Sequence, residues 1–134
     1  WSDVSPMPAS VYSGAEILSP EVTNIVLEWM KTVVDKGSGW SARVDRYRIG
    51  GKTGTAQKSK NGKYSNSKIC SFVASLPIND PRYVVLVVVD EPKKPYAYGS
   101  TVAAPVAQKV IESLLVLEKI PPSDHTKSFS SLEN

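Results

Sequence analysis

The sequence is poor in the residues on which disulfides, metal sites and histidine-dependent catalysis rely. Among its 134 residues there is a single cysteine, Cys70, which excludes an internal disulfide and is expected to be a small buried side chain. The single histidine, His125, lies in a polar stretch near the C-terminus. Neither a metal site nor a serine–histidine pair therefore has the residues that it needs, and we expect no metal and no other cofactor.

The sequence also lacks a long apolar run, a strong charge and a leader. Its longest continuous apolar run, residues 84–89, is far shorter than the roughly 20 residues that a bilayer-spanning helix needs. Sixteen lysines and arginines against 13 aspartates and glutamates give a net charge of +3, too small and too scattered to indicate nucleic-acid binding. No signal peptide opens the chain, and because it begins with Trp1 instead of methionine we expect a fragment of a longer protein.

What the sequence does contain is a polar, glycine-rich stretch at residues 50–57, directly after the strand-like run 47–49. Side chains alternate between the two faces of a strand, which separates Lys52, Gly54 and Ala56 from Thr53, Thr55 and Gln57. Two hydroxyls two positions apart can hold both oxygens of a carboxylate. A glycine inside a strand often marks the close approach of another backbone or a ligand, and backbone N–H groups along an unpaired edge can bind an oxyanion.

On either side of the expected strands, the sequence predicts a helix. Ser19 is suited to cap the first helix, Pro20 to its first position and Gly37 to the residue after its end. A second helix is expected over residues 101–119, with Pro105 in its first turn. Apolar residues at helical spacing form the stripes that we expect to be buried: Val22, Ile25, Val26, Trp29, Met30 and Val33 in the first helix, and Ala103, Val106, Ala107, Val110, Leu114 and Leu117 in the second.

Between these helices we expect three strands joined by turns. The glycine-rich strand is followed by a polar loop over residues 58–67, in which Asn61-Gly62 is a hairpin signal, and then by a strand over 69–76. Residues 83–89 are continuously apolar and β-branched, which is typical of a central strand covered on both faces. The expected fold is therefore α+β, with a three-stranded antiparallel sheet flanked by helices.

The remaining segments are expected to lie outside this core. Residues 1–18 contain two prolines and a glycine without a clear period, and we interpret them as an extended connection. Residues 37–40 are expected to be a flexible joint between the first helix and the sheet. Pro121-Pro122 should stop the second helix, so residues 19–120 form the predicted folded part and 121–134 a disordered tail.

The string Tyr-Arg-Ile-Gly-Gly-Lys-Thr-Gly-Thr-Ala-Gln-Lys at residues 47–58 resembles the Lys-Thr-Gly box, the third signature of the penicillin-binding proteins. Its ending, Thr-Ala-Gln, is similar to that of the class B transpeptidases. Residues 17–21, 71–74 and 99–105 also resemble this family, and the similarity covers about residues 15–120. The order of the predicted elements is that of the C-terminal part of the transpeptidase domain.

This resemblance implies an enzyme that cross-links peptidoglycan stem peptides during cell division or elongation. In the family, a serine attacks the D-Ala-D-Ala bond, forms an acyl-enzyme and passes the acyl group to an amine, and β-lactams acylate the same serine. The implied partners are stem peptides, β-lactams, the rest of the domain and proteins of a division or elongation complex. The implied location is the extracytoplasmic, periplasmic face of the cytoplasmic membrane, with an anchor outside this chain.

The resemblance also implies roles for four residues of the box. Lys52 is expected to be catalytic, because it sets the electrostatics and the proton network around the serine. The hydroxyls of Thr53 and Thr55 are expected to bind the terminal carboxylate of the substrate or the antibiotic, and Gly54 to leave room for the substrate along the strand. Thr55 is also expected to be catalytic through its backbone N–H, as one of two oxyanion donors.

The two other signatures of the family, Ser-x-x-Lys and Ser-x-Asn, belong upstream of the Lys-Thr-Gly box. Both strings occur here only downstream of it, at residues 65–68 and 59–61, in the polar loop. We interpret them as coincidences. The nucleophile is therefore absent from this chain, which we expect to be inactive alone and to belong to a split, truncated or cleaved enzyme.

Three other functions remain open on the sequence alone. A serine β-lactamase or D,D-carboxypeptidase shares the Lys-Thr-Gly box, although the Thr-Ala-Gln ending disfavours it. A non-catalytic module that binds a partner or a cell-wall peptide would need no nucleophile. Nucleic-acid binding through Lys58, Lys60 and Lys63 near Tyr64 is explained better by a solvated charged loop.

Overall fold

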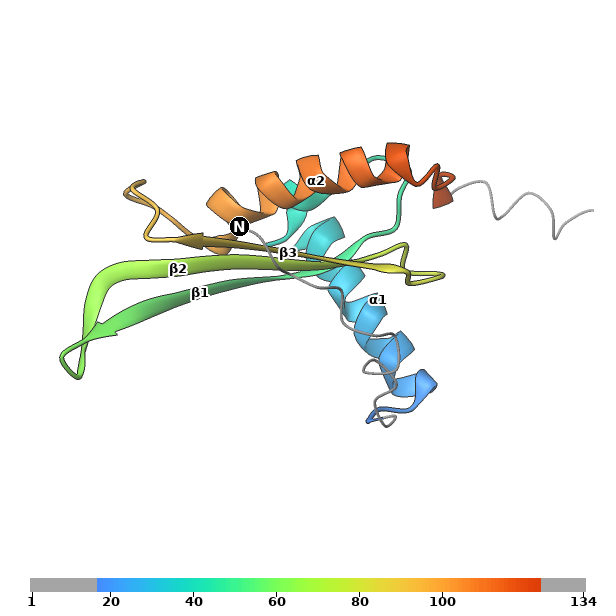
Figure 1. Cartoon of the computed structure of the whole chain (residues 1–134). Helices are drawn as coiled ribbons and strands as arrows, with labels where there is room; N and C mark the ends of the chain where they lie inside the picture. The colour runs from blue at the N-terminus through green and yellow to red at the C-terminus, as the bar shows by residue number, and fades with distance from the viewer. Residues whose placement is uncertain (1–16, 124–134) are drawn as a thin grey trace, which may run out of the picture.

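The computed structural model describes residues 17–123, which form one antiparallel sheet and two long helices (Figure 1). Most of the predicted N-terminal connection, residues 1–16, lies outside the described part. The elements follow in the order α1 (Pro20–Lys36), a 3₁₀ turn (Trp40–Ala42), β1 (Gly50–Lys60), β2 (Lys63–Leu76), β3 (Tyr83–Asp90), a π-helical turn (Gly99–Ala103) and α2 (Ala104–Leu117). The sheet order is β1-β2-β3, so the predicted α+β fold with an antiparallel meander is confirmed.

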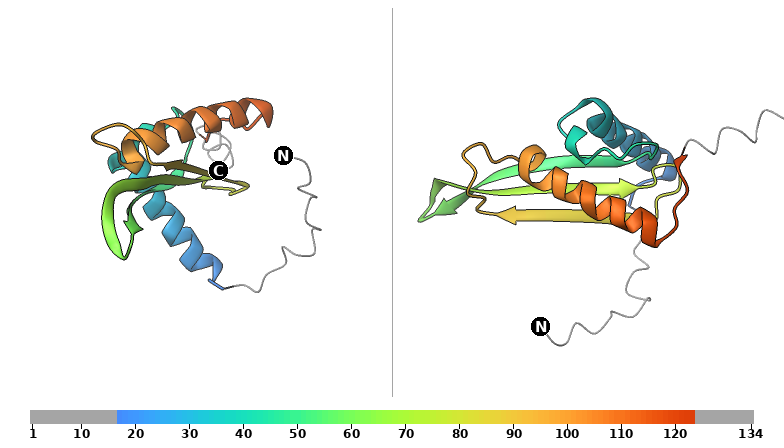
Figure 2. Two further views of the ribbon diagram at one scale, coloured as in Figure 1. Left: turned by 60° about the vertical axis from the view of Figure 1, so that its left-hand side comes forward. Right: turned by 90° about the horizontal axis from the view of Figure 1, so that it is seen from above.

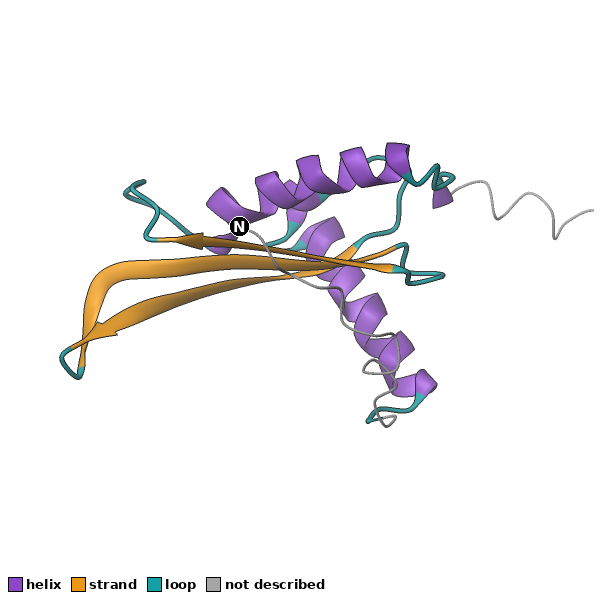
Figure 3. Ribbon diagram, in the orientation of Figure 1, coloured by secondary structure: helices purple, strands orange, loops and turns teal. Residues whose placement is uncertain are grey.

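Strands β1 and β2 form a long hairpin around Asn61-Gly62. Both turn residues have positive φ, 53° and 74°, the conformation that a two-residue hairpin turn needs. The polar loop predicted over residues 58–67 is wrong, because both strands continue to this turn and only the turn is irregular (Figure 3). The polar composition of this segment indicated a loop. The tight turn instead allows the polar ends of the two strands to pair with each other.

The core lies between one face of the sheet and α2, which runs across that face (Figures 1 and 2). The side chains of Phe72 and Leu76 on β2 and Ile111 on α2 are fully buried there. The buried residues of the helical segment are Ala103, Ala104, Ala107, Ile111 and Leu115. Ala103 and Ala107 of the predicted stripe are therefore confirmed, whereas Val106, Val110 and Leu117 of the same stripe are 48%, 45% and 77% exposed, which corrects the prediction. This segment carries apolar residues on two stripes, and periodicity cannot decide which one faces the sheet.

The helical segment over residues 99–117 is apolar enough, by length and composition alone, to cross a membrane. The sequence prediction considered only uninterrupted apolar runs and did not find it. Ala107, Ile111 and Leu115 of this segment belong to the same buried cluster as the sheet residues. We therefore interpret it as a core helix of the fold.

Helix α1 begins and ends as predicted but buries little of its expected stripe. Ser19 caps it, with Oγ accepting a hydrogen bond from the Val22 N–H at 3.4 Å, and Gly37 is its C-terminal cap. Only Leu27 and Val34 are buried, and Trp29, predicted to lie in the core, is 68% exposed. The N-terminal half of α1 extends away from the sheet, so no described element lies against its apolar side (Figure 1).

Strand β3 is covered on one face only, which corrects the prediction of a strand buried on both. Val85 faces the core, whereas Val84, Leu86 and Val88 on the other face are 73%, 64% and 55% exposed. The apolar residues of the run do form a strand, but within residues 17–123 only one face of the sheet has a helix packed across it. The side chains on the other face are therefore exposed.

Candidate functional site

The glycine-rich box lies at the start of β1, which is an edge strand of the described sheet. The segment 47–49 before it is not a strand, and regular pairing begins at Gly50. Lys52, Thr53, Gly54 and Thr55 pair with Val73, Phe72, Ser71 and Cys70 of β2, respectively. Within the described residues β1 pairs only with β2, so one row of its backbone N–H and C=O groups has no strand partner, and we call this side of β1 the open edge. The start of the strand lies against α1, because a Cβ on Gly50 would lie 3.1 Å from Met30 Cβ.

Thr53 and Thr55 lie on the same face of β1, as the alternation predicts. Their cross-strand partners Phe72 and Cys70 are fully buried, which identifies this face as the core side of the sheet. The Thr53 Oγ1 atom lies 3.0 Å from Ser38 Oγ, and the Thr55 Oγ1 atom accepts a hydrogen bond of 3.0 Å from the Gly99 N–H.

Lys52 lies on the opposite face of the strand and is exposed. Its Nζ donates a hydrogen bond of 2.9 Å to the Thr53 carbonyl oxygen. The register places Lys52 beside Val73 and, one strand further, Leu86. The lysine therefore shares a face with the exposed apolar side chains of β3, which we call the open face: Val84, Leu86 and Val88.

Gly54 is the site where another backbone approaches the box, as a glycine in a strand suggests. A Cβ on Gly99 would lie 2.4 Å from the Ser71 carbonyl oxygen and 2.7 Å from that of Gly54. A Cβ on Gly54 would lie 2.5 Å from Ser71 Oγ. Gly99 thus lets the turn before α2 lie directly on the β1–β2 pair, whereas a side chain on Gly54 would point to Ser71 Oγ and not to this turn.

The turn that carries Gly99 is held by the Thr101 side chain. Its Oγ1 accepts a hydrogen bond of 3.0 Å from the Tyr98 N–H and donates to the Tyr96 carbonyl oxygen at 3.0 Å. Such π-helical turns are rare and occur often at functional sites. Sequence reasoning missed the contact of Gly99 with Thr55, and its only signal was a glycine at the start of an apolar helix.

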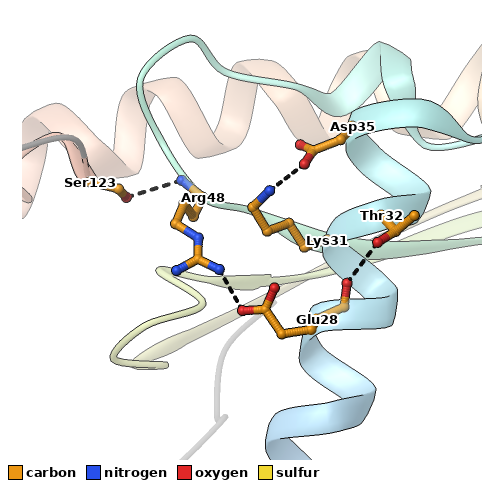
Figure 4. Close-up of polar contacts among 6 residues, drawn as sticks. All are labelled: Glu28, Lys31, Thr32, Asp35, Arg48 and Ser123. Atoms are coloured by element: carbon orange, nitrogen blue, oxygen red, sulfur yellow. Dashed lines mark hydrogen bonds and ion pairs between the residues drawn. The ribbon is translucent and has the colours of Figure 1, made fainter. Parts of the chain in front are cut away.

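The start of β1 is tied to α1 and to the C-terminal end of the described chain through Arg48 (Figure 4). The Arg48 guanidinium pairs with Glu28 on α1, and its backbone N–H donates to Ser123 Oγ at 3.0 Å. Ser123 is buried, and its own N–H donates to the Arg46 carbonyl oxygen at 2.9 Å. The first three residues of the predicted tail are therefore placed, and the rest, 124–134, lie outside the described residues.

An ion-paired lysine holds the far end of the box strand. Lys58 of β1 lies 2.9 Å from Glu91 and 3.0 Å from Asp90, at the end of β3. The hydrogen bonds to Glu91 and Asp90, in that order, raise the pKa of Lys58 above its ordinary value. This lysine, one of the three considered for nucleic acid, thus connects β1 to β3 across β2.

The two downstream strings that imitate the missing signatures lie on the hairpin and not on a helix. Ser65 and Lys68 are three residues apart on β2, so their side chains point to opposite faces. The Ser65 hydroxyl donates to the Lys58 carbonyl oxygen at 2.9 Å, and the Lys68 ammonium lies 4.5 Å from the centre of the Tyr98 ring. The Lys68 ammonium and the Ser65 hydroxyl therefore have different partners and do not form the serine–lysine pair of the missing signature.

Comparison with known proteins identifies the family of this fold and box. The sequence model of the family 'Penicillin binding protein transpeptidase domain' matches residues 9–112 of this chain. The FtsI homolog of Mesostigma viride, a peptidoglycan D,D-transpeptidase, is 49% identical over 110 residues, which are 81% of this chain and 18% of that protein. The chain spans less than a fifth of the length of the first curated relatives that it matches.

Solved structures with the same arrangement are transpeptidases of this kind. The transpeptidase domain of Burkholderia pseudomallei penicillin-binding protein 3 has a TM-score of 0.75 and 35% identity over 82% of this chain and 34% of its own. Penicillin-binding protein 3 of Mycobacterium tuberculosis, complexed with ampicillin, has a TM-score of 0.71 and 27% identity over 79% of this chain and 26% of its own. The chain therefore belongs to the penicillin-binding protein transpeptidase domain family, among homologues of the FtsI type.

Proposed function

We propose that this chain is the C-terminal part of a class B D,D-transpeptidase that cross-links peptidoglycan stem peptides and binds β-lactams. The observation that carries the proposal is the edge strand β1. This strand presents the Lys52 ammonium on one face and the hydroxyls of Thr53 and Thr55 on the other. No described strand pairs with its open edge. A substrate peptide aligned with this edge would meet all three groups.

The threonine pair is proposed to bind the carboxylate of the terminal D-alanine or of the β-lactam. A carboxylate only accepts hydrogen bonds, so each hydroxyl must keep its proton available. The Thr55 Oγ1 atom accepts from the Gly99 N–H, which leaves its proton free to donate. Gly54, on the opposite face beside Lys52, is proposed to leave room for the substrate along the strand, and the Thr55 N–H is proposed as an oxyanion donor.

The nucleophilic serine is proposed to come from the rest of the domain. Relatives are more than five times longer than the matched segment. Lys52 shares the open face with Val84, Leu86 and Val88, so a segment that covers these apolar side chains would also meet the lysine. Lys52 would then stabilise the charge of the serine network as the serine attacks the D-Ala-D-Ala carbonyl carbon and D-alanine leaves.

The cellular setting is proposed from the family. FtsI-type relatives support a role in septal or elongation synthesis outside the cytoplasmic membrane, with an anchor that precedes this segment in the complete protein. The proposed partners are stem peptides, the remainder of the domain and proteins of a division or elongation complex.

The experiment compares acylation of the complete transpeptidase before and after Lys52→Ala. Second-order acylation rates are measured with a penicillin and with its carboxyl ester. Lys52→Ala should slow both reactions by a similar factor, because the lysine acts on the nucleophile and not on the carboxylate. Unchanged rates with both compounds would contradict the catalytic role of Lys52.

A further inference from the structure

Ser38 lies beside the box although it is 15 residues away in the sequence. Its Oγ atom lies 3.0 Å from Thr53 Oγ1, and either atom can donate the proton. The side chain belongs to the turn after α1, which sequence reasoning interpreted as a flexible joint without a role for this serine. No other sequence signal pointed to this contact.

This turn packs closely against the core, at the place where the sequence predicted a flexible joint. The N–H groups of Gly37 and Gly39 both donate to the Val33 carbonyl oxygen at 3.0 Å. A Cβ on Gly37 would lie 2.9 Å from that oxygen, and a Cβ on Gly39 would lie 3.2 Å from the Phe72 ring. The backbone on both sides of Ser38 is thus in close contact with its surroundings, most closely at Gly37.

The direction of the hydrogen bond between Ser38 and Thr53 follows from what a carboxylate needs. A hydroxyl has one proton and two lone pairs, whereas a carboxylate offers only lone pairs. When Thr53 donates its proton to a carboxylate, the Ser38 hydroxyl must be the donor to Thr53 Oγ1. The Gly99 N–H already has this relation to Thr55. Each threonine would then accept from a segment outside the box and donate toward the open edge.

We propose that Ser38 is a positioning residue that orients and polarises the Thr53 hydroxyl for the substrate carboxylate; this inference rests on the proposed function. By donating to Thr53 Oγ1, Ser38 holds the threonine proton away from the core. Hydrogen bonds in such a chain strengthen one another. Ser38 thereby raises the preference of the site for acyl donors that carry a carboxylate.

The test measures acylation of the complete transpeptidase by a penicillin and by its carboxyl ester. Ser38→Ala should lower the rate with the penicillin by about threefold to tenfold, the range for one hydrogen bond, and lower the rate with the ester much less. Ser38→Thr keeps the donor and should restore most of the preference. Ser38→Asp replaces the donor with an acceptor that repels the carboxylate and should cause a larger loss than alanine.

Ser113→Ala is the matched control, because Ser113 is an exposed serine on α2 whose Oγ makes one hydrogen bond, to the Lys109 carbonyl oxygen. It should leave both rates unchanged. Equal losses with both compounds in Ser38→Ala would show a merely structural role, and a faster reaction would show that Ser38 restrains Thr53; either result overturns the inference. If Thr53→Val loses the carboxylate preference and Ser38→Ala keeps it, only the inference about Ser38 fails. A wild-type protein that neither compound acylates would overturn the proposed function as well.

Discussion

At the scale of single residues, the Thr55 side chain has two separable tasks. Its Oγ1 accepts from the Gly99 N–H, and its proton is proposed to serve the carboxylate. Thr55→Val removes both, and a hydrogen bond to a charged group is worth about 1.5–3 kcal/mol. We expect acylation by a penicillin to slow by roughly tenfold to a hundredfold in the complete enzyme, and acylation by its ester much less.

Thr55→Ser separates the loss of the hydroxyl from a change of packing. Serine keeps the acceptor for Gly99 and the donor for the ligand, so we expect most of the wild-type rate to return. Equal losses for the two compounds in Thr55→Val would contradict carboxylate binding and leave the Gly99 contact as the function of this hydroxyl.

Gly99 and Gly54 should respond differently to the same substitution. The Cβ of Gly99→Ala would meet backbone oxygens of Ser71 and Gly54, whereas the Cβ of Gly54→Ala would meet only the Ser71 hydroxyl, which can rotate away. We expect Gly99→Ala to lower the free energy of unfolding by about 1–3 kcal/mol, as overpacking does, and Gly54→Ala by less. Urea unfolding measures the free energy of both variants. A larger loss for Gly54→Ala than for Gly99→Ala would contradict this account of the packing.

The residues of the box could be predicted because their arrangement is local. The alternation of a strand alone puts Thr53 and Thr55 on one face and Lys52 on the other, and the structure agrees. The partners of the hydroxyls could not be predicted, because Ser38 and Gly99 reach them only through the packing of segments 15 and 44 residues away.

At the scale of secondary-structure elements, β3 was predicted correctly as a strand, but the prediction that both of its faces are buried was wrong. The apolar run predicted the strand, but such a run does not show how many faces of the sheet are covered by helices of this chain. In this chain Leu86→Ala should lower the free energy of unfolding by less than about 1 kcal/mol, because Leu86 is 64% exposed. Ile111→Ala, at a fully buried position of α2, should cost about 2–5 kcal/mol.

The same pair of substitutions in the complete transpeptidase domain tests whether the open face becomes covered. There Leu86→Ala should approach the cost of Ile111→Ala. Thermal or urea unfolding of both proteins gives the comparison. A Leu86→Ala cost that stays small in the complete domain would show that the open face remains in water.

The junction of β3 and α2 contains a tyrosine whose titration reports on that junction. The Tyr83 hydroxyl donates a hydrogen bond of 2.8 Å to the Glu118 carboxylate, which raises the pKa of Tyr83 above its ordinary value of about 10. The stabilising effect of this bond is therefore present below pH 10 and is lost as the pH rises through the higher folded-state pKa.

Glu118→Gln should bring the pKa of Tyr83 back toward the ordinary value. The Tyr83 ring resonances, followed by NMR across alkaline pH and assigned with Tyr83→Phe, measure this change. An unchanged pKa in Glu118→Gln would mean that the carboxylate does not hold the tyrosine in solution.

At the scale of the whole molecule, the described chain leaves three apolar surfaces without a partner. They lie on the first half of α1, on the open face of β3 and on the outer stripe of α2, and include Trp29, Leu86 and Val110. Isolated exposed apolar side chains are ordinary, but contiguous ones indicate a contact surface. The wrong burial predictions for all three elements fall on these surfaces, and the exposed stripes are what we expect if the rest of the domain packs against them.

The most direct test is the mapping of a covalent penicillin adduct. This chain and the complete transpeptidase that contains it are each incubated with a fluorescent penicillin, denatured and analysed by peptide mass spectrometry. We predict no stoichiometric label on the chain alone, and in the complete protein one label on a serine outside residues 1–134 that is lost or strongly slowed in Lys52→Ala. A stoichiometric label on Ser65, or on any other residue of this chain, would contradict the proposal that it supplies the Lys-Thr-Gly strand to a nucleophile carried elsewhere.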